Sequence, residues 1–185
     1  MQDDSIELMR RAKEGDRSSY ASLVEKYTPT LRRLSYLLLH SSTEADDVVQ
    51  ETFANALQRI AQFRGEGEPR SWFYSIALNA CRRRQREQRS RERGMDPSHL
   101  ETGRKFALEP RGVLTSLVRR ETARQLAIAL GFLTDDQREA FVLHYVEELH
   151  HEEIAAILGT SVVASRALAH RARLALQQKL PGLKI

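Results

Sequence analysis

Apolar residues recur every three or four positions along most of this chain, and that spacing limits the folds open to it. Between residues 20 and 38 the apolar positions are Tyr20, Leu23, Val24, Tyr27, Leu31, Leu34 and Leu38. Residues at these intervals share one face of an α-helix. No stretch alternates apolar and polar residues as a half-buried strand does, and helix-favouring Ala, Leu, Glu, Gln and Arg dominate long stretches. We therefore predict an all-α protein.

Capping and breaking residues divide this pattern into helices. A first helix begins at Asp4 or Ser5 and ends near Gly15, and Asp16 starts a second, in which Pro29 predicts a kink or a break. A third begins at Ser42 or Thr43, with a buried stripe of Val49, Phe53, Ala56, Leu57 and Ile60. After a loop containing Gly65, Gly67 and Pro69, a fourth begins at Ser71. Four more are expected over residues 113–131, 134–146, 151–158 and 162–179.

The periodicity stops between residues 88 and 110, where Gly, Pro, Ser and charged residues follow without a sustained apolar pattern. A chain of 185 residues is long enough for two small domains. We predict a first helical domain over residues 1–90, a flexible linker over 91–112 and a second helical domain over 113–185. In the second domain Thr134 and Gln137 resemble a capping box, and Gly131 resembles a helix terminator.

Positive charge is unevenly distributed. The net charge is only +4, but seven Arg and two Glu lie between Arg82 and Arg93. Such a block indicates either a solvated helix end or an anionic partner.

The N-terminus, MQDDSIELMRR, lacks the apolar segment of a signal peptide, and the longest apolar run, Leu37 to Leu39, is far too short to cross a bilayer. The single cysteine, Cys81, excludes an internal disulfide and fits a reducing compartment. We expect a cytoplasmic protein without membrane insertion, in which Cys81 is buried and inert.

The segment EEIAAILGTSVVASRALAHRARLAL is typical of a helix-turn-helix. Gly159 supplies the positive φ of the turn, and small Ala155 lets the two helices approach each other. The second helix exposes basic side chains suited to phosphates and base edges in the major groove, namely Arg166, His170, Arg171 and Arg173. A structural hairpin with a basic outer face is the alternative.

The helix from Ser42 carries an acidic face opposite Val49 and Phe53. Asp46 with Gln50, and Asp47 with Glu51, are four residues apart and therefore adjacent on the helix surface. On a basic protein this indicates a second, protein partner, with a solvated surface as the alternative.

We expect no metal, no cofactor and no enzyme activity. His144, His150 and His151 lie near several glutamates, but their spacing matches neither H-E-x-x-H nor a Cys/His zinc site, and a solvated polar turn is the simpler interpretation. The chain shows no nucleophile with an adjacent base and no phosphate-binding Gly loop.

The order of these segments is similar to bacterial sigma factors of the extracytoplasmic-function (ECF) type. The resemblance rests on DDVVQETFANALQRIAQFRG, then SWFYSIALNACRRR, then LTDDQREAFVLHYVEELHHEEIAAILGTS and HRARLAL, and it covers nearly the whole chain except the linker.

The resemblance implies three partners: core RNA polymerase, contacted through its β′ coiled coil and β subunit, promoter DNA and an anti-sigma factor. By it, Asp46, Asp47, Gln50 and Glu51 dock on the β′ coiled coil. The loop from Arg64 and Gly65 to Arg70, with the start of the next helix, captures a base flipped from the −10 element, and Asn79 matches the asparagine of the −10-reading helix. The helix-turn-helix matches the module that reads the −35 element as duplex.

Helical periodicity refines the −10 surface. Trp72, Phe73, Ile76, Ala77 and Ala80 share one side and are expected in the core, although Trp72 and Tyr74 flank the loop and are also candidates to stack on a base. The other side carries a polar stripe of Ser75, Asn79, Arg82 or Arg83, and Arg86. A melted strand offers such a stripe both base edges and phosphates, and a pocket for an extruded base offsets part of the unstacking cost.

The second domain departs from the family pattern in two places. Glu148 and His150 stand where the family usually has Gly and then Ser or Thr, which replaces the usual N-cap by a weaker one. Ser165 and Leu168 replace a β-branched residue and an Arg in the recognition helix. If Leu168 joins the core beside the inward stripe of Ser165, Ala169 and Ala172, the helix rotates slightly. We place Arg166 and His170 on bases and Arg171 and Arg173 on phosphates.

Two alternatives to a promoter-specificity factor remain open at this point. One is a helix-turn-helix regulator that binds an operator alone as a dimer, which requires tight duplex binding by the isolated chain. The other is an adaptor or anti-factor partner that binds only protein.

Overall fold

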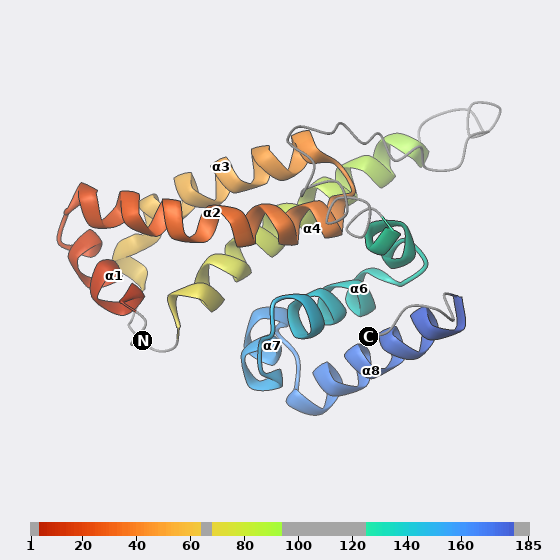
Figure 1. Ribbon diagram of the computed structural model, residues 1–185. Helices are drawn as coiled ribbons and strands as arrows, with labels where there is room; N and C mark the ends of the chain where they lie inside the picture. Colours follow the sequence, from red (N-terminus) through yellow and green to blue (C-terminus); the bar gives the residue numbers. More distant parts are fainter. Residues whose placement is uncertain (1–3, 64–67, 94–124, 180–185) are drawn as a thin grey trace, which may run out of the picture.

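The computed structural model describes residues 4–63, 68–93 and 125–179, and every regular element in these ranges is helical (Figure 1). The first domain contains α1 (Ser5–Lys13), α2 (Arg17–Leu39), α3 (Ser42–Arg59), the 3₁₀ turn η1 (Ile60–Gln62) and α4 (Pro69–Arg93). The second contains a helix over residues 125–130, α6 (Asp135–Phe141), the π turn η3 (Val142–Val146), α7 (His151–Leu158) and α8 (Val162–Lys179). The predicted all-α, two-domain architecture is confirmed. Gly65, Gly67 and nearly all of the predicted linker lie outside the described residues.

The helix starts follow local capping chemistry. The Asp16 carboxylate accepts hydrogen bonds from the backbone N–H of Ser18 and Ser19, and the Ser41 hydroxyl accepts one from Glu44 at the start of α3. The fourth helix begins at Pro69 rather than at Ser71, because the fixed φ of proline suits the first helical position, where its missing N–H breaks no helical bond.

Pro29 does not break α2. The helix continues through it from Arg17 to Leu39, and the neighbouring Tyr27 and Leu31 are buried, with 4% and 0% of their surface exposed. An internal proline costs a helix about 3 kcal/mol. Burial of the side chains on both sides of Pro29 offsets that cost, at roughly 1.5–3 kcal/mol for each large apolar group.

The core of the first domain lies where α2, α3 and α4 meet. Phe73 of α4 is fully buried, with its ring centroid 5.0 Å from that of Tyr27 and 5.6 Å from that of Phe53. On α3 the buried stripe also takes in Val48 and Thr52, and the expectation for Leu57 was wrong: 53% of Leu57 is exposed. Because α2 and α4 cover only one side of α3, a residue on the flank of the stripe stays in solvent.

Cys81 belongs to the same core. Its side chain is fully buried, and burial raises the pKa of its thiol to about 12. The thiol is therefore protonated at neutral pH and unreactive, as expected from the sequence.

The second domain confirms the predicted signals around its turns. The Thr134 hydroxyl accepts a hydrogen bond from the Gln137 backbone, and the Gln137 side chain accepts one from the Thr134 backbone. Gly159 ends α7 with a φ of 68°, the left-handed conformation predicted for the turn. Glu148 is also left-handed, with a φ of 55°, so the chain places a glutamate where a glycine is favoured.

The two domains pack against each other. In Figure 1, α6 and α7 lie below α4, while α3 lies on the far side of the first domain. α4 contacts α7, α2 contacts η3, and the buried apolar residues of both domains form one continuous core. No helix in the described ranges combines the length and apolarity needed to cross a bilayer.

Candidate nucleic-acid interface

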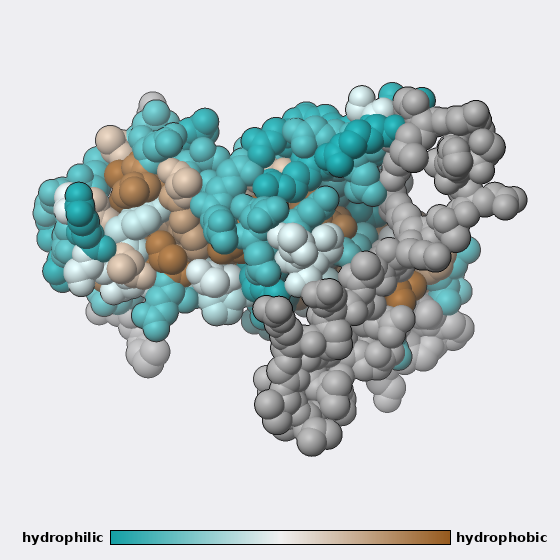
Figure 2. Space-filling view, turned by 90° about the horizontal axis from the view of Figure 1, so that it is seen from above, coloured by the Kyte–Doolittle hydropathy of each residue, from teal (hydrophilic) through white to brown (hydrophobic). Residues whose placement is uncertain are grey.

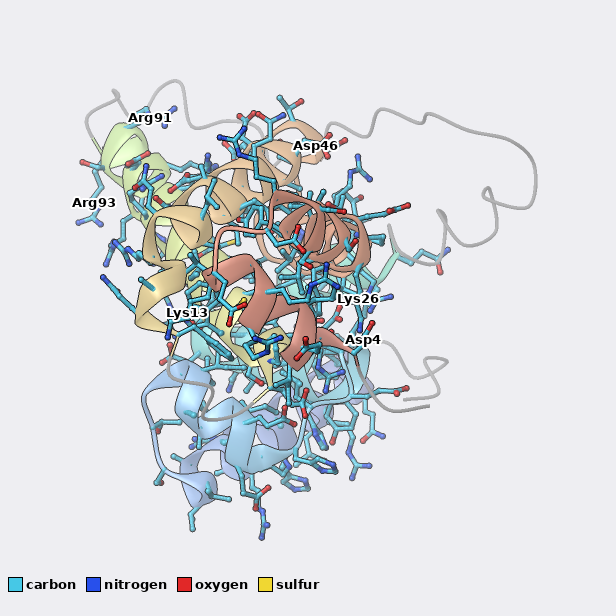
Figure 3. The ribbon with its side chains drawn as sticks, turned by 90° about the vertical axis from the view of Figure 1, so that its left-hand side faces the viewer. Asp4, Lys13, Lys26, Asp46, Arg91 and Arg93 are labelled. Carbon is cyan, nitrogen blue, oxygen red and sulfur yellow. The ribbon has the colours of Figure 1, made fainter. Side chains whose placement is uncertain are left out.

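The acidic face of α3 is exposed, and part of it is already paired with arginines. Asp46, Asp47 and Gln50 are exposed, and Asp46 accepts a hydrogen bond of 2.5 Å from Arg32. Figure 3 shows the labelled Asp46 on the side of the molecule opposite the second domain. The face seen from above in Figure 2 is mostly hydrophilic, with small and separate apolar areas. This surface is open to a polar partner.

Glu51 differs from its neighbours, because it links α3 to α4. It is half-buried and accepts hydrogen bonds of 2.6 Å from Arg83 and 2.8 Å from Arg84. Burial acts to raise the pKa of the Glu51 carboxyl, but the two arginines outweigh it, so the pKa lies below its ordinary value. Glu51 is therefore ionised and holds two side chains of the arginine block in place.

Only part of the predicted polar stripe of α4 faces solvent. Asn79, Arg83 and Arg86 are exposed. Ser75 is half-buried, and its hydroxyl donates a hydrogen bond of 2.7 Å to the carbonyl of Trp72. The open part of the stripe thus places one amide ahead of two guanidinium groups. Arg91 and Arg93 continue the basic character at the end of α4, on the side of the molecule away from the blue C-terminal helices (Figure 3).

The aromatic residues at the start of α4 mostly hold the helix in its domain. Trp72 is half-buried, and its ring packs 5.6 Å from Phe63 and 5.3 Å from Phe73. Tyr74 is fully buried, with its hydroxyl donating a hydrogen bond of 2.6 Å to Glu147 in the second domain. The expectation that Tyr74 is available to stack on a base is therefore wrong in this arrangement. Arg64 and Gly65, predicted in the preceding loop, lie outside the described residues.

Two further predicted −10 residues of α4, Arg82 and Arg70, are half-exposed and pair with acids of the second domain. Arg82 donates hydrogen bonds of 2.9 and 2.6 Å to the two carboxylate oxygens of Glu139 in α6. Arg70 lies 3.9 Å from the carboxylate of Glu153 in α7. Burial raises the pKa of Glu139, and the Arg82 guanidinium opposes that rise.

Glu147 is the centre of a second contact between the domains. Its side chain is 1% exposed, and it receives hydrogen bonds from Arg33 and from Tyr74. The sequence interpretation of this region as a solvated polar turn was wrong for Glu147. The sequence did hold a signal for this burial. Glu139 and Glu147 flank the segment from Ala140 to Val146, which is apolar apart from His144, and a charged side chain beside such a segment needs a partner when it is buried.

α8 presents the predicted basic face. Ser165, Ala169 and Ala172 point inward, as predicted, while Arg166, His170 and Arg171 are exposed. Arg173 is half-buried, and its Nε is buried without a hydrogen-bond partner among the described residues. Leu168 is half-buried and lies outside the apolar core, so it does not take the core role considered above.

The histidines near α7 pack against each other. The rings of His144 and His151 stack with centroids 4.2 Å apart, and His151 Nδ1 lies 3.0 Å from the Ser165 hydroxyl. Burial, with the charges of His144 and Arg166, lowers the pKa of His151. Within residues 4–63, 68–93 and 125–179, no three His, Cys, Asp or Glu side chains are grouped so as to hold a metal ion.

Two family matches and several relatives fit this arrangement of surfaces. Residues 23–91 match sigma-70 region 2, and residues 120–176 match sigma-70 region 4. The RNA polymerase sigma factor YlaC of Bacillus subtilis (strain 168) is 31% identical over 171 residues, covering 89% of this chain and 93% of the relative. The chain belongs to the sigma-70 family.

Further likeness places this sigma factor in the ECF group. The ECF RNA polymerase sigma-E factor of Escherichia coli (strain K12) is 30% identical, covering 95% of this chain and 94% of the relative. The structure of the sigma factor RpoE with the anti-sigma factor NepR from Bartonella quintana superposes with a TM-score of 0.71, at 26% identity, covering 89% of this chain and 98% of that one. The resemblance inferred from sequence is thus confirmed.

In this sigma factor α3 and nearly all of α4 fall within the region 2 match, and α6, α7 and most of α8 fall within the region 4 match. The ion pairs Arg82–Glu139 and Arg33–Glu147 therefore join region 2 to region 4. The sequence motifs could not predict these two ion pairs, because each pair joins a residue of one region to a residue of the other.

Proposed function

We propose that this sigma factor binds core RNA polymerase, recognises the −35 element as duplex through α8, and melts and captures the −10 element through α4. The observation that carries the proposal is the presence of two surfaces in one chain. One is a helix-turn-helix with exposed Arg166, His170 and Arg171, and the other is an α4 face that exposes Asn79 ahead of Arg83 and Arg86.

The two surfaces suit two forms of DNA. A basic helix presented by a helix-turn-helix fits the major groove of duplex DNA, where side chains reach base edges and phosphates. The α4 stripe offers an amide for hydrogen bonds to an unpaired base and guanidinium groups for its phosphates. We place Arg166 and His170 on bases and Arg171 and Arg173 on phosphates. Arg64, Gly65, Arg70, Trp72, Ser75, Asn79, Arg82, Arg83 and Arg86 form the proposed −10 surface.

Core polymerase docks, in this proposal, on the exposed α3 surface of Asp46, Asp47, Gln50 and Glu51. Asp47 and Gln50 are open to a partner, whereas Glu51 is shared with Arg83 and Arg84. Polymerase bound at α3 would sit directly beside the α4 DNA surface.

The proposal includes residues 1–90 as the polymerase and −10 domain, 91–112 as the linker and 113–185 as the −35 domain. By likeness to the RpoE–NepR complex, an anti-sigma factor is a further proposed partner. We also propose that the protein is cytoplasmic, is not an enzyme and uses no cofactor.

DNA binding with and without polymerase tests the proposal. A pool of promoter-length genomic fragments is mixed with the sigma factor alone, core polymerase alone, or both, and heparin-resistant complexes are recovered. We expect resistant, sequence-selective complexes only with both proteins. Selective complexes with the isolated chain would instead support an operator-binding regulator, and their absence in every mixture would support a protein adaptor.

A further inference from the structure

One large apolar side chain of α8 is left almost entirely in solvent. Val163 is 76% exposed, more than any other large apolar residue in the described ranges. It is the second residue of α8 and so belongs to the first turn of that helix. A single exposed apolar residue is ordinary on a protein surface, so its meaning depends on the face that it occupies.

Val163 shares the outward face of α8 with the residues proposed to contact bases. Arg166, Ala167 and His170 follow it at three, four and seven positions, which places the four side chains on one side of the helix. All four are exposed, whereas Ser165 is fully buried. α8 packs against α6 and α7, and in Figure 1 it lies at the opposite edge of the molecule from α3.

The start of α8 is held by two contacts, which define the direction of Val163. The Ser161 hydroxyl accepts a hydrogen bond of 3.1 Å from the backbone N–H of Ala164. The buried Ser165 hydroxyl lies 3.0 Å from Nδ1 of His151 in α7. A β-branched side chain in a helix also strongly prefers one rotamer. The two methyl groups of Val163 are therefore presented in a defined position, at little further cost in conformational entropy.

Methyl groups at this position match one feature of duplex DNA. In a helix-turn-helix, the N-terminal residues of the second helix contact base edges in the major groove. Among the base edges there, only thymine presents a methyl group, at C5, and the other edges present hydrogen-bond donors and acceptors. Val163 cannot pair with a donor or an acceptor, and covering one would leave it without a partner. The side chain therefore favours thymine.

The neighbouring side chains allow a contact at close range. Ala167 lies one turn after Val163 and adds only a methyl group, so the helix can approach the bases closely. Arg166 can bind a guanine through two hydrogen bonds. Arg166 also lies 3.5 Å from Glu152, but with the two side chains 64% and 66% exposed, this ion pair contributes little and leaves Arg166 available to DNA.

We propose that Val163 is a specificity-determining residue that contacts the C5-methyl group of a thymine in the −35 element. The inference rests on the proposed function for the assignment of α8 to −35 duplex. It adds a base preference read by apolar contact to those read by hydrogen bonds.

Removal of single methyl groups from the DNA tests the contact. A promoter duplex is selected from genomic fragments with holoenzyme formed from this chain and core polymerase. Each thymine of its −35 element, on either strand, is then replaced singly by deoxyuridine, which lacks only the C5-methyl group. Competition binding compares these duplexes for holoenzymes containing the parent chain, Val163→Ala or Ile6→Ala. Ile6→Ala is the matched control, because it removes an exposed apolar side chain from α1, outside every proposed binding surface.

With the parent and with Ile6→Ala, loss of the methyl group at one thymine should weaken binding about fourfold, the effect of removing one buried methyl group from an apolar contact. With Val163→Ala the ratio at that position should fall to near one, and circular dichroism should show unchanged helix content. A selected −35 element without a methyl-sensitive thymine would overturn the inference. An equal loss of binding in the parent and in Val163→Ala would overturn it as well.

The selection step separates this result from the test of the proposed function. Selective complexes with holoenzyme, but no effect of methyl removal, would remove the inference about Val163 alone. Selective complexes with the isolated chain only would count against the proposed function, and the same deoxyuridine comparison on those fragments would then decide the role of Val163. Absence of selective DNA binding in both preparations would overturn both.

Discussion

Arg33 and Glu147 are separated by 114 residues, yet the Arg33 guanidinium donates two hydrogen bonds of 2.8 Å to the two oxygens of the Glu147 carboxylate. Tyr74 donates a third bond, of 2.6 Å, to the same carboxylate. Two helices of the first domain, α2 and α4, thus meet the second domain at one buried anion. Because a buried charge that loses its partner costs about 3–5 kcal/mol, this site makes the packing of the two domains sensitive to single substitutions.

The exposed acid Asp47 tests the α3 surface. Asp47→Lys should weaken binding to core RNA polymerase about tenfold, a loss of about 1.4 kcal/mol, because it reverses a charge at the proposed contact. Titration of labelled protein with core polymerase measures the change. Glu25→Lys reverses a similarly exposed charge on α2 and should bind as the parent does. Equal affinities for all three proteins would mean that the acidic face is only solvated.

Asn79 tests the reading of the −10 element. Asn79→Ala removes the exposed amide of the α4 stripe and should lower open-complex formation about tenfold, since one lost base contact costs about 1–3 kcal/mol. Permanganate reactivity of unpaired thymines measures opening, and polymerase affinity should stay unchanged. Gln58→Ala, which removes an exposed amide from α3, is the control and should open promoters as the parent does. An Asn79→Ala protein that opens altered −10 sequences with the selectivity of the parent contradicts the assignment.

The left-handed backbone of Glu148 tests the turn before α7. With a φ of 55°, Glu148→Gly should raise the free energy of unfolding by about 0.5–1 kcal/mol, because glycine adopts this conformation without a side-chain clash. The same change at Glu152, which lies within α7, should lower it by about 1 kcal/mol. Urea unfolding measures both, and a destabilised Glu148→Gly protein would show that the glutamate side chain contributes more than its strain costs.

Acid unfolding tests the bonds from Arg83 and Arg84 to Glu51. Their hydrogen bonds hold the pKa of Glu51 below its ordinary 4.5, so the folded state binds this proton more weakly than the unfolded state does. The resulting stability is present above pH 4.5 and is lost as the pH falls through the folded-state pKa. Urea unfolding between pH 7 and pH 3 should show a smaller loss of stability for Glu51→Gln than for the parent. Parallel curves would contradict the lowered pKa.

Local features of the fold could be predicted from sequence because they depend on residues close together in the chain. The capping box of Thr134 and Gln137, the left-handed Gly159 and the inward Ser165 are of this kind. The burial of Tyr74 and the pairing of Arg82 with Glu139 could not be predicted in the same way. Both depend on how two domains dock, and helical periodicity describes only the faces of one helix at a time.

The same distinction between local features and domain docking applies to the candidate DNA-binding residues of α4. Periodicity correctly separated buried Phe73 from exposed Asn79, since both sit on one helix. It placed Arg82 on an open face that α6 in fact covers. For Pro29, the local rule predicted a disruption, but packing of α2 against α3 and α4 prevailed over a break.

The mapping of transcript starts tests the central claim most directly. Purified core polymerase is incubated with a fragmented genomic library, with and without this sigma factor, and the 5′ ends of the transcripts are sequenced. We predict starts that appear only with the sigma factor and that share conserved segments near −35 and −10. Starts that are identical with and without it, or that share no upstream sequence, would contradict a promoter-specificity factor.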